Sequence, residues 1–321
     1  MKILAHIIGV LSAITAFIDG HAATLKIVTS VAPITNIVRN VAGENSSVHG
    51  IVPEGMNSHT FEPVPSDIKW LREADLIVLN GLDLETPTLH LAQKVKRDNT
   101  PILLLADNTL ARSEWRYDFS FPKDKGHPNP HLWPNIAHAM RFVELARDAL
   151  SALDGTHAAQ YRANAAAYLV KLKTLDTAIF VCVQGIPEPN RKLVTYHDSY
   201  AYFATRYGMR VVGAVQPADF SEPSPREVAR IITQLRREQV PAIFGSEVFP
   251  SKVLEQISRE AGARYIDQLA DDDLPGGLYE PQHTFIGMMV RNMQLMTQAL
   301  GGDPGCVAQV DVTNIGTAQR R

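Results

Sequence analysis

The chain has 321 residues, of which 45% are hydrophobic and 20% are charged, so it is long enough for two globular domains with separate cores. Its formal net charge is −3, and no long basic run interrupts the sequence. This balance argues against nucleic acid and against an anionic membrane surface as partners.

The N-terminal residues have the pattern of a secretory signal. A lysine at position 2 precedes an apolar stretch from Ile3 to Ile18, and small residues follow up to Ala23. The stretch is short for a membrane span and contains His6, which favours cleavage of residues 1–23 over a membrane anchor. No cysteine stands at the expected cut. We therefore expect a soluble periplasmic protein without a lipid anchor.

Residues 24–155 are expected to form a first α/β lobe. Short apolar runs there alternate with helical patterns, as in parallel βαβ units. The expected strands cover 25–30, 48–52, 76–80 and 102–105, and the expected helices cover 32–42, 65–73, 87–96 and 136–153.

One long helix is expected over 156–185. The stretch up to Val183 is rich in alanine and leucine and contains neither proline nor glycine. Nearly thirty residues of helix would span roughly 40 Å, which suits a rigid strut between two lobes. Pro187 and Pro189 then stop the pattern.

Residues 186–300 repeat the alternation and are expected to form a second α/β lobe. The expected strands cover 192–196, 210–215, 242–245 and 264–267, and the expected helices cover 199–207, 224–239, 251–261 and 284–300. Residues 301–321 begin with a Gly-Gly-Asp-Pro sequence and are expected to form a loose tail.

Two cysteines, Cys182 and Cys306, are available for a disulfide. In an oxidising compartment two thiols tend to pair. Cys182 lies in an apolar run, where it can also be a small buried side chain, and Cys306 lies in the expected tail. The sequence leaves the pairing open. Neither cysteine has the surroundings of a metal ligand.

Three histidines stand in loop-like segments at similar intervals, and a carboxylate follows them. They are His59, His131 and His197, and the carboxylate is Asp267. Each lies beside a strand end or in a connecting loop, and the carboxyl ends of parallel strands are where α/β sheets bind ligands. Imidazoles on rigid loops are good ligands for divalent transition metals, so the pattern predicts a metal site between the lobes. The acidic run at 271–273 is expected to be a solvated loop.

Four segments resemble a known family in the same order. They are PEGMNSHTFEP at 53–63, NGLDLE at 80–85, NPHLW at 129–133 and YHDSYAYF at 196–203. They resemble the periplasmic metal-binding proteins of zinc and manganese ABC importers, the zinc-uptake or TroA-like solute-binding family (cluster A-I). The resemblance implies two (β/α) lobes with parallel sheets, joined by one long rigid backbone helix, with the metal in the interlobe cleft.

The resemblance also implies a function. Such a protein is not an enzyme: it captures metal with high affinity and delivers it to an ABC permease in the inner membrane. A periplasmic metallochaperone is a further partner that the family suggests, and a monomer is the expected state.

The ligands implied by the resemblance are His59 and His131 from the first lobe, then His197 and Asp267 from the second. Histidine at the third position resembles the zinc branch, and manganese is the alternative. The chain lacks the long histidine-rich loop of many zinc members, since only His127 precedes the second ligand there.

The residue types agree with zinc. Three neutral imidazoles and one carboxylate can close a tetrahedron around Zn²⁺, whereas Mn²⁺ prefers more oxygens, which a bidentate Asp267 would supply. Glu62, Asp198 and Glu247 are candidate acceptors that would orient the histidines through hydrogen bonds.

A secreted zinc hydrolase is the competing hypothesis, with Glu247 beside a zinc-activated water. Two observations weigh against it. Asp267 would fill the coordination position that a catalytic site keeps open, and the chain contains no HExxH motif.

Overall fold

A computed structural model describes residues 24–216, 221–246 and 252–316. The expected signal at 1–23 lies outside this range, as does Glu247.

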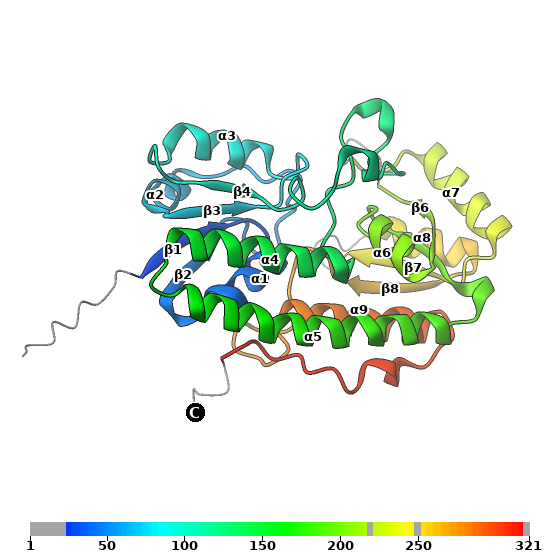
Figure 1. Cartoon of the computed structure of the whole chain (residues 1–321). Coiled ribbons are helices and arrows are strands. Elements are labelled where there is room, and N and C mark those ends of the chain that lie inside the picture. Colours follow the sequence, from blue (N-terminus) through cyan, green and yellow to red (C-terminus); the bar gives the residue numbers. More distant parts are fainter. Residues whose placement is uncertain (1–23, 217–220, 247–251, 317–321) are drawn as a thin grey trace, which may run out of the picture.

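Strands and helices alternate along the chain as predicted (Figure 1). The strands are β1 (Leu25–Thr29), β2 (Ser46–Gly50), β3 (Leu76–Leu79), β4 (Ile102–Leu104), β5 (Lys192–Thr195), β6 (Arg210–Ala214), β7 (Ala242–Ser246) and β8 (Arg264–Leu269). The α-helices are α1 (Ala32–Ala42), α2 (Pro65–Glu73), α3 (Thr86–Val95), α4 (Ile136–Leu153), α5 (Ala158–Gly185), α6 (Ala201–Tyr207), α7 (Pro225–Glu238), α8 (Lys252–Ala261) and α9 (Phe285–Ala299).

The strands form two parallel four-stranded sheets, one in each lobe. The first has the order β2-β1-β3-β4 and the second the order β6-β5-β7-β8. In both sheets, the second strand along the chain is added on one side of the first strand and the later strands on the other side. The switch point therefore lies between β1 and β3 in the first sheet and between β5 and β7 in the second. Loops diverge at such a switch point and leave a crevice at the carboxyl ends of the strands. The predicted fold class is thus confirmed.

Helix α5 has 28 residues and joins the two lobes (Figure 1). Its buried side chains recur every three or four residues, the spacing that places them on one face of a helix. They include Tyr161, Tyr168, Leu172, Leu175 and Ile179. This face packs against α1, α4 and α9.

Helix α9 also crosses between the lobes, which the sequence did not indicate. It contacts α1 of the first lobe and β8 of the second, and it runs beside α5 in Figure 1. The hydrophobic core follows both helices: one cluster contains Ile27 and Leu76 of the first sheet together with Leu193 and Phe244 of the second. The lobes therefore share a core along α5 and α9.

The outer face of the second sheet has a smaller cluster of its own. Val194 and Ile243 lie one residue away from Leu193 and Phe244, and alternate residues of a strand point to opposite faces. On the outer face they pack with Leu235 of α7.

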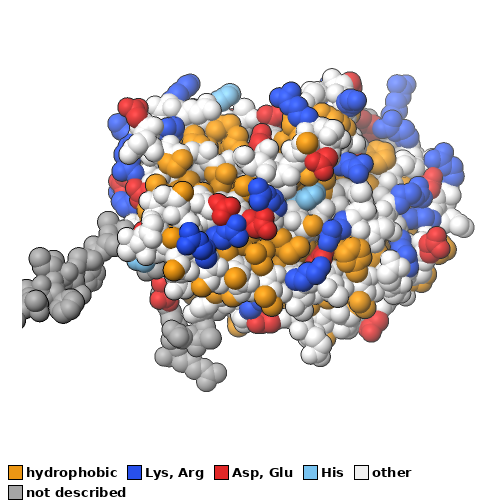
Figure 2. Space-filling view, in the orientation of Figure 1, with side chains coloured by type: hydrophobic (Ala, Val, Ile, Leu, Met, Phe, Trp, Pro, Cys, Tyr) orange, Lys and Arg blue, Asp and Glu red, His pale blue; other side chains and the backbone are white. Residues whose placement is uncertain are grey.

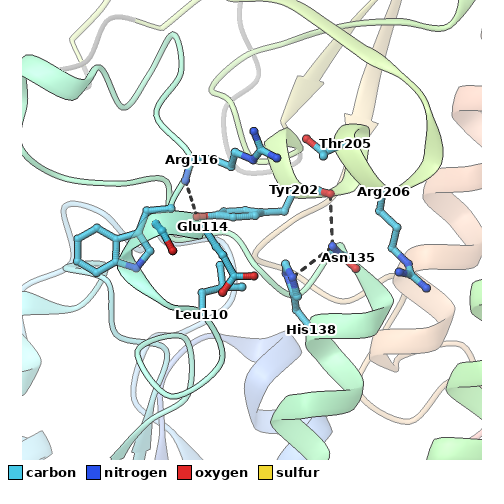
Figure 3. A pocket seen from close by; sticks show the side chains of 10 residues that line it. Leu110, Glu114, Arg116, Asn135, His138, Tyr202, Thr205 and Arg206 are labelled. Atoms are coloured by element: carbon cyan, nitrogen blue, oxygen red, sulfur yellow. Dashed lines mark hydrogen bonds between the residues drawn. The ribbon is translucent and has the colours of Figure 1, made fainter.

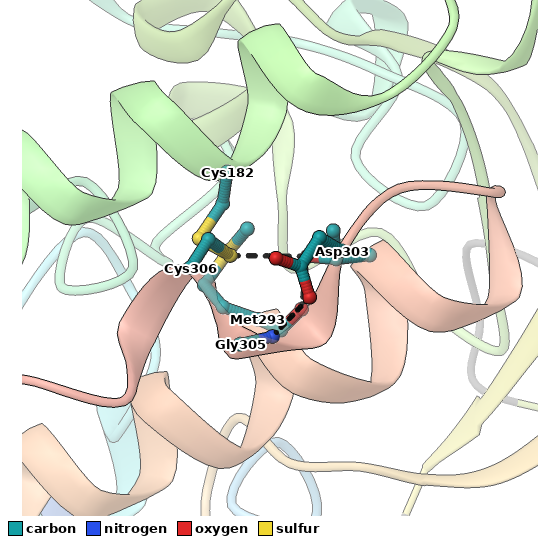
Figure 4. The surroundings of a disulfide bond; sticks show 6 residues. Cys182, Met293, Asp303, Gly305 and Cys306 are labelled. Carbon is teal, nitrogen blue, oxygen red and sulfur yellow. Dashed lines mark hydrogen bonds between the residues drawn. A yellow bond between two sulfur atoms is a disulfide. The ribbon is translucent and has the colours of Figure 1, made fainter.

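The C-terminal segment is packed rather than loose through Gly316, the last described residue. Cys306 forms a disulfide with Cys182 of α5, with Cα atoms 5.3 Å apart (Figure 4). Farther along, Asn314 Oδ1 accepts hydrogen bonds from Asn36 and Asn40 of α1, at 3.0 and 2.8 Å. The segment thus runs from the disulfide to the first lobe.

Acidic and basic side chains are interspersed over the face shown in Figure 2. This agrees with the small net charge of −3. Within the described ranges, no helix combines the length and apolar character that a membrane span requires.

Candidate metal site

The structure brings the three predicted histidines together from three loops. His59 follows β2, His131 lies between β4 and α4, and His197 comes two residues after β5. His131 Nε2 is 3.2 Å from His59 Nε2 and 3.4 Å from His197 Nε2. His131 and His197 are buried, and His59 is partly buried. Three ring nitrogens therefore converge on one point at the carboxyl ends of the two sheets.

The carboxylate at this point is Asp271, which corrects the prediction of Asp267. Asp271 Oδ2 lies 2.9 Å from His197 Nε2 and 3.9 Å from His131 Nε2. Asp267 is exposed on β8 and belongs to neither group of adjacent metal-type ligands that the described residues form. The chain therefore places its acidic group four residues later than predicted.

The length of β8 explains the difference. The strand continues to Leu269, so Asp267 is still inside it, and only the residues beyond Leu269 reach the carboxyl end of the sheet. Two hydrogen bonds hold the backbone just beyond the end of β8. Tyr200 Oη donates to Ala270 O, and Trp133 Nε1 donates to Asp271 O, both at 2.8 Å. Had the expected strand ended at residue 269 instead of 267, the sequence would have indicated the acidic run at 271–273 as the source of the carboxylate.

The acidic run at 271–273 is not a solvated loop, contrary to expectation. Asp271 and Asp272 are buried, with 2% and 6% of their surface exposed. Asp272 also has an oxygen within 4.8 Å of ligand atoms of His131 and Asp271. Ser58 Oγ donates to Asp272 Oδ2 at 2.6 Å. A second carboxylate therefore lies at the edge of the histidine cluster.

Asn129 orients His131, a role that the sequence analysis missed. The amide nitrogen of Asn129 donates to Asp118 Oδ2 at 2.7 Å and to Asp198 O at 2.6 Å. Its Oδ1 therefore faces His131 Nδ1, 2.9 Å away, and accepts a hydrogen bond from the protonated Nδ1. The tautomer that this contact favours leaves the lone pair of His131 Nε2 directed at the cluster.

The structure places the three carboxylates that were predicted to orient the histidines in different surroundings. Glu62 is exposed, and no hydrogen bond joins it to a histidine in the described part of the chain. Asp198 is buried next to His197, but its Oδ1 accepts a hydrogen bond from Tyr200 N. Its backbone oxygen accepts a hydrogen bond from Asn129 Nδ2. Asp198 thus supports the site through the backbone. Glu247 lies outside the described residues.

Burial keeps His59 and His131 in the neutral form that binds metal. Burial, and then the neighbouring His197, lowers the pKa of His59 to about 3. The pKa of His131 is also well below its ordinary value, because of burial and then because of His59. Burial, the largest single influence, opposes ionisation of Asp271, but His197, Ser199 and His59 together outweigh it and hold the pKa of Asp271 below its ordinary value. The neutral imidazoles of His59 and His131, beside an ionised carboxylate, suit a divalent cation.

The lowered pKa of His59 predicts that the contribution of this residue to the stability of the metal-free protein falls as the pH falls from about 6.5 towards 3. In this window the unfolded chain, whose histidines have ordinary pKa values near 6.5, binds protons that folded His59 does not. One such group changes the free energy of unfolding by at most about 1.4 kcal/mol per pH unit. Urea unfolding at a series of pH values measures the slope.

In this pH window a His59→Asn variant should lose less stability, or gain more, per unit of falling pH than the wild type does. His90→Asn, which replaces an exposed histidine on α3, is the matched control and should keep the original slope. Equal slopes for the wild type and His59→Asn would contradict the prediction.

A small cavity connects His59 with the surface. It has a volume of about 180 Å³, and its lining includes His59, Phe121, Asp83 and His127. At its exposed rim His127 Nδ1 lies 2.8 Å from Asp83 Oδ2. His59 is thus the histidine of the cluster that faces a route for an ion from solvent.

A larger cavity of about 460 Å³ lies elsewhere between the lobes and contains none of the converging side chains (Figure 3). Tyr202 of α6 crosses it. Its hydroxyl accepts a hydrogen bond from Arg116 N at 3.0 Å, and its backbone oxygen accepts one from Asn135 Nδ2 at 3.4 Å. Tyr202 therefore links the second lobe to the connection that carries His131.

Comparison with known proteins shows one family over most of the chain. A family model described as "Zinc-uptake complex component A periplasmic" matches residues 27–299. The manganese-binding lipoprotein MntA of Halalkalibacterium halodurans is 32% identical over 88% of this chain and 90% of its own length. The iron-binding protein YfeA of Yersinia pestis is 31% identical over 87% of each chain.

A solved structure shows the same fold. The periplasmic zinc-binding protein TroA from Treponema pallidum superposes with a TM-score of 0.77 at 26% identity. The match covers 85% of this chain and 98% of that one.

The relatives correct the expected localisation. MntA and several streptococcal relatives are named lipoproteins, which implies membrane attachment through a lipid. This contradicts the prediction of an unanchored periplasmic protein without a lipobox cysteine. A location outside the cytoplasm agrees with the names of both the relatives and TroA.

Proposed function

This chain belongs to the family of periplasmic zinc-uptake components and is a metal-binding solute-binding protein of an ABC importer, and we propose that its cargo is zinc. In this proposal the protein captures Zn²⁺ with high affinity and delivers it to the permease in the inner membrane.

The convergence of three imidazoles and one carboxylate supports zinc. His59, His131 and His197 supply nitrogen, and Asp271 supplies oxygen, within a few ångströms of one another. Four ligands of this kind form a tetrahedral Zn²⁺ site, and the usual affinity order places zinc far above manganese for such a set. A fourth protein ligand also fills the position that a hydrolytic site would keep open for water.

The division of the ligands between the lobes supports a carrier. His59 and His131 come from the first lobe, and His197 and Asp271 come from the second. A small separation of the lobes would remove two of the four ligands at once. Metal release in this proposal needs lobe movement and no chemical reaction.

Manganese is the second candidate, and one observation favours it. Asp272 brings another oxygen close to His131 and Asp271, and Mn²⁺ prefers more oxygens and a higher coordination number than Zn²⁺. MntA is named a manganese-binding protein and YfeA an iron-binding protein. Against this, Asp272 Oδ2 is engaged by Ser58.

A competition titration tests the proposal. The purified, demetallated protein is titrated with Zn²⁺ and with Mn²⁺ against a chelator of known affinity, and the bound metal is identified by elemental analysis. We expect one tightly bound zinc per chain and manganese binding weaker by several orders of magnitude. Manganese bound as tightly as zinc would assign the protein to manganese transport, and tight binding of neither would refute the site.

A further inference from the structure

We propose that a clasp between the two lobes sets how long the metal stays bound. The clasp consists of Glu54, Gly55 and Ser58 from the loop after β2, and of Asp272, Asp273 and His283 from the segment between β8 and α9. The inference rests on the proposed function, because it concerns release of the metal held by the adjacent ligands.

Three contacts make up the clasp. Ser58 Oγ donates to Asp272 Oδ2 at 2.6 Å. The backbone N–H of Gly55 donates to both carboxylate oxygens of Asp273, at 3.0 and 2.8 Å. His283 Nε2 lies 3.2 Å from Glu54 Oε1. Every contact pairs a group of the first lobe with a group from the segment that carries Asp271.

The clasp is adjacent in sequence to one metal-site residue on each side. Ser58 precedes His59, and Asp272 follows Asp271. Neither partner can move away from the other without displacing a neighbouring ligand. The first and fourth ligands are thus tied together by protein contacts as well as by the metal.

The surroundings make these contacts effective. Ser58 and Asp272 are buried, and so is His283, which keeps water from competing for their hydrogen bonds. Gly55 has a φ of 80°, in the left-handed region that favours glycine, where its N–H meets Asp273.

The clasp should act on release and not on capture. It forms when the His59 loop and the Asp271 loop meet, and it must break before the two ligands separate. A metal entering the open lobes meets no clasp, so the association rate should not depend on it. Loss of one contact should raise the dissociation rate about tenfold.

Two pairs of variants test this in the full-length purified protein loaded with Zn²⁺. Ser58→Ala removes the hydroxyl, and Ser58→Thr retains one. Asp273→Ala removes both acceptor oxygens, and Asp273→Asn retains one for Gly55 N. Stopped-flow transfer of zinc to excess chelator gives the dissociation rate, and mixing of metal-free protein with zinc gives the association rate.

The controls separate the clasp from a general loosening of the lobes. Asp267→Ala removes an exposed acid from β8, next to the same loop. Tyr202→Phe removes an interlobe hydrogen bond that is outside the clasp. The absorption spectrum of the Co²⁺-loaded protein reports whether the ligand set of each variant is intact.

We expect faster zinc release in Ser58→Ala and Asp273→Ala, recovery in Ser58→Thr and Asp273→Asn, and unchanged association rates and Co²⁺ spectra. Wild-type release rates in both alanine variants would overturn the clasp, and so would equal acceleration in the two controls. Failure of the proposed function itself is distinguishable, because the wild-type protein would then bind no zinc.

Discussion

Replacing Asp271 with alanine is expected to remove most of the zinc affinity, whereas replacing Asp267 with alanine should leave the affinity unchanged. Asp271 lies 2.9 Å from His197 Nε2 and is the ionised group of the cluster. Removing one partner from a buried charged arrangement costs about 3–5 kcal/mol, which corresponds to a loss of roughly two to four orders of magnitude in affinity. The chelator competition titration measures both variants.

His197→Ala is the reference for this experiment, because it removes a histidine from the same cluster and should lose affinity to a similar degree. Circular dichroism and urea unfolding of each metal-free variant check that the fold is retained. A loss of affinity in Asp267→Ala with normal binding in Asp271→Ala would restore the original prediction and contradict the geometry described above.

Removing the disulfide between Cys182 and Cys306 should cause a large loss of stability although the bond lies outside the metal site. The two cysteines are 124 residues apart in sequence, so the bond closes a very long loop in the unfolded chain. The loop-entropy model assigns about 4–5 kcal/mol to a loop of this order, and native disulfides typically contribute about 2–5 kcal/mol. Urea unfolding of a Cys182→Ala/Cys306→Ala double variant measures the change.

The reduced wild-type protein provides the matching control for that variant. It should unfold at a similarly lowered urea concentration, because it lacks the same constraint. A double variant as stable as the oxidised wild type would show that the hydrogen bonds from Asn36 and Asn40 to Asn314 suffice to hold the C-terminal segment.

Local patterns predicted the two sheets and the long helix correctly. The buried face of α5 follows from the spacing of its apolar residues, and each short apolar run between turn residues became a strand. The convergence of His59, His131 and His197 was also predictable. Each lies in a connection that leaves the carboxyl end of a strand, and parallel sheets bring their carboxyl ends to one edge.

The acidic partner could not be chosen in this way. Asp267 and Asp271 both follow the start of β8 closely, and only pairing with β7 determines how far the strand extends. The same holds for Asn129, whose role depends on Asp118 and on the backbone of Asp198 from the other lobe. Such contacts join residues far apart in sequence, so no local pattern records them.

The amino-acid sequence thus determined the elements of this protein, its class of fold and the three histidines, because these depend on periodicity and on strand ends. The tertiary structure decided that Asp271 joins them, that Cys182 pairs with Cys306 and that α9 and the C-terminal segment return to the first lobe. Each of these is a meeting of distant segments, and the packing of the shared core along α5 and α9 determines which segments meet.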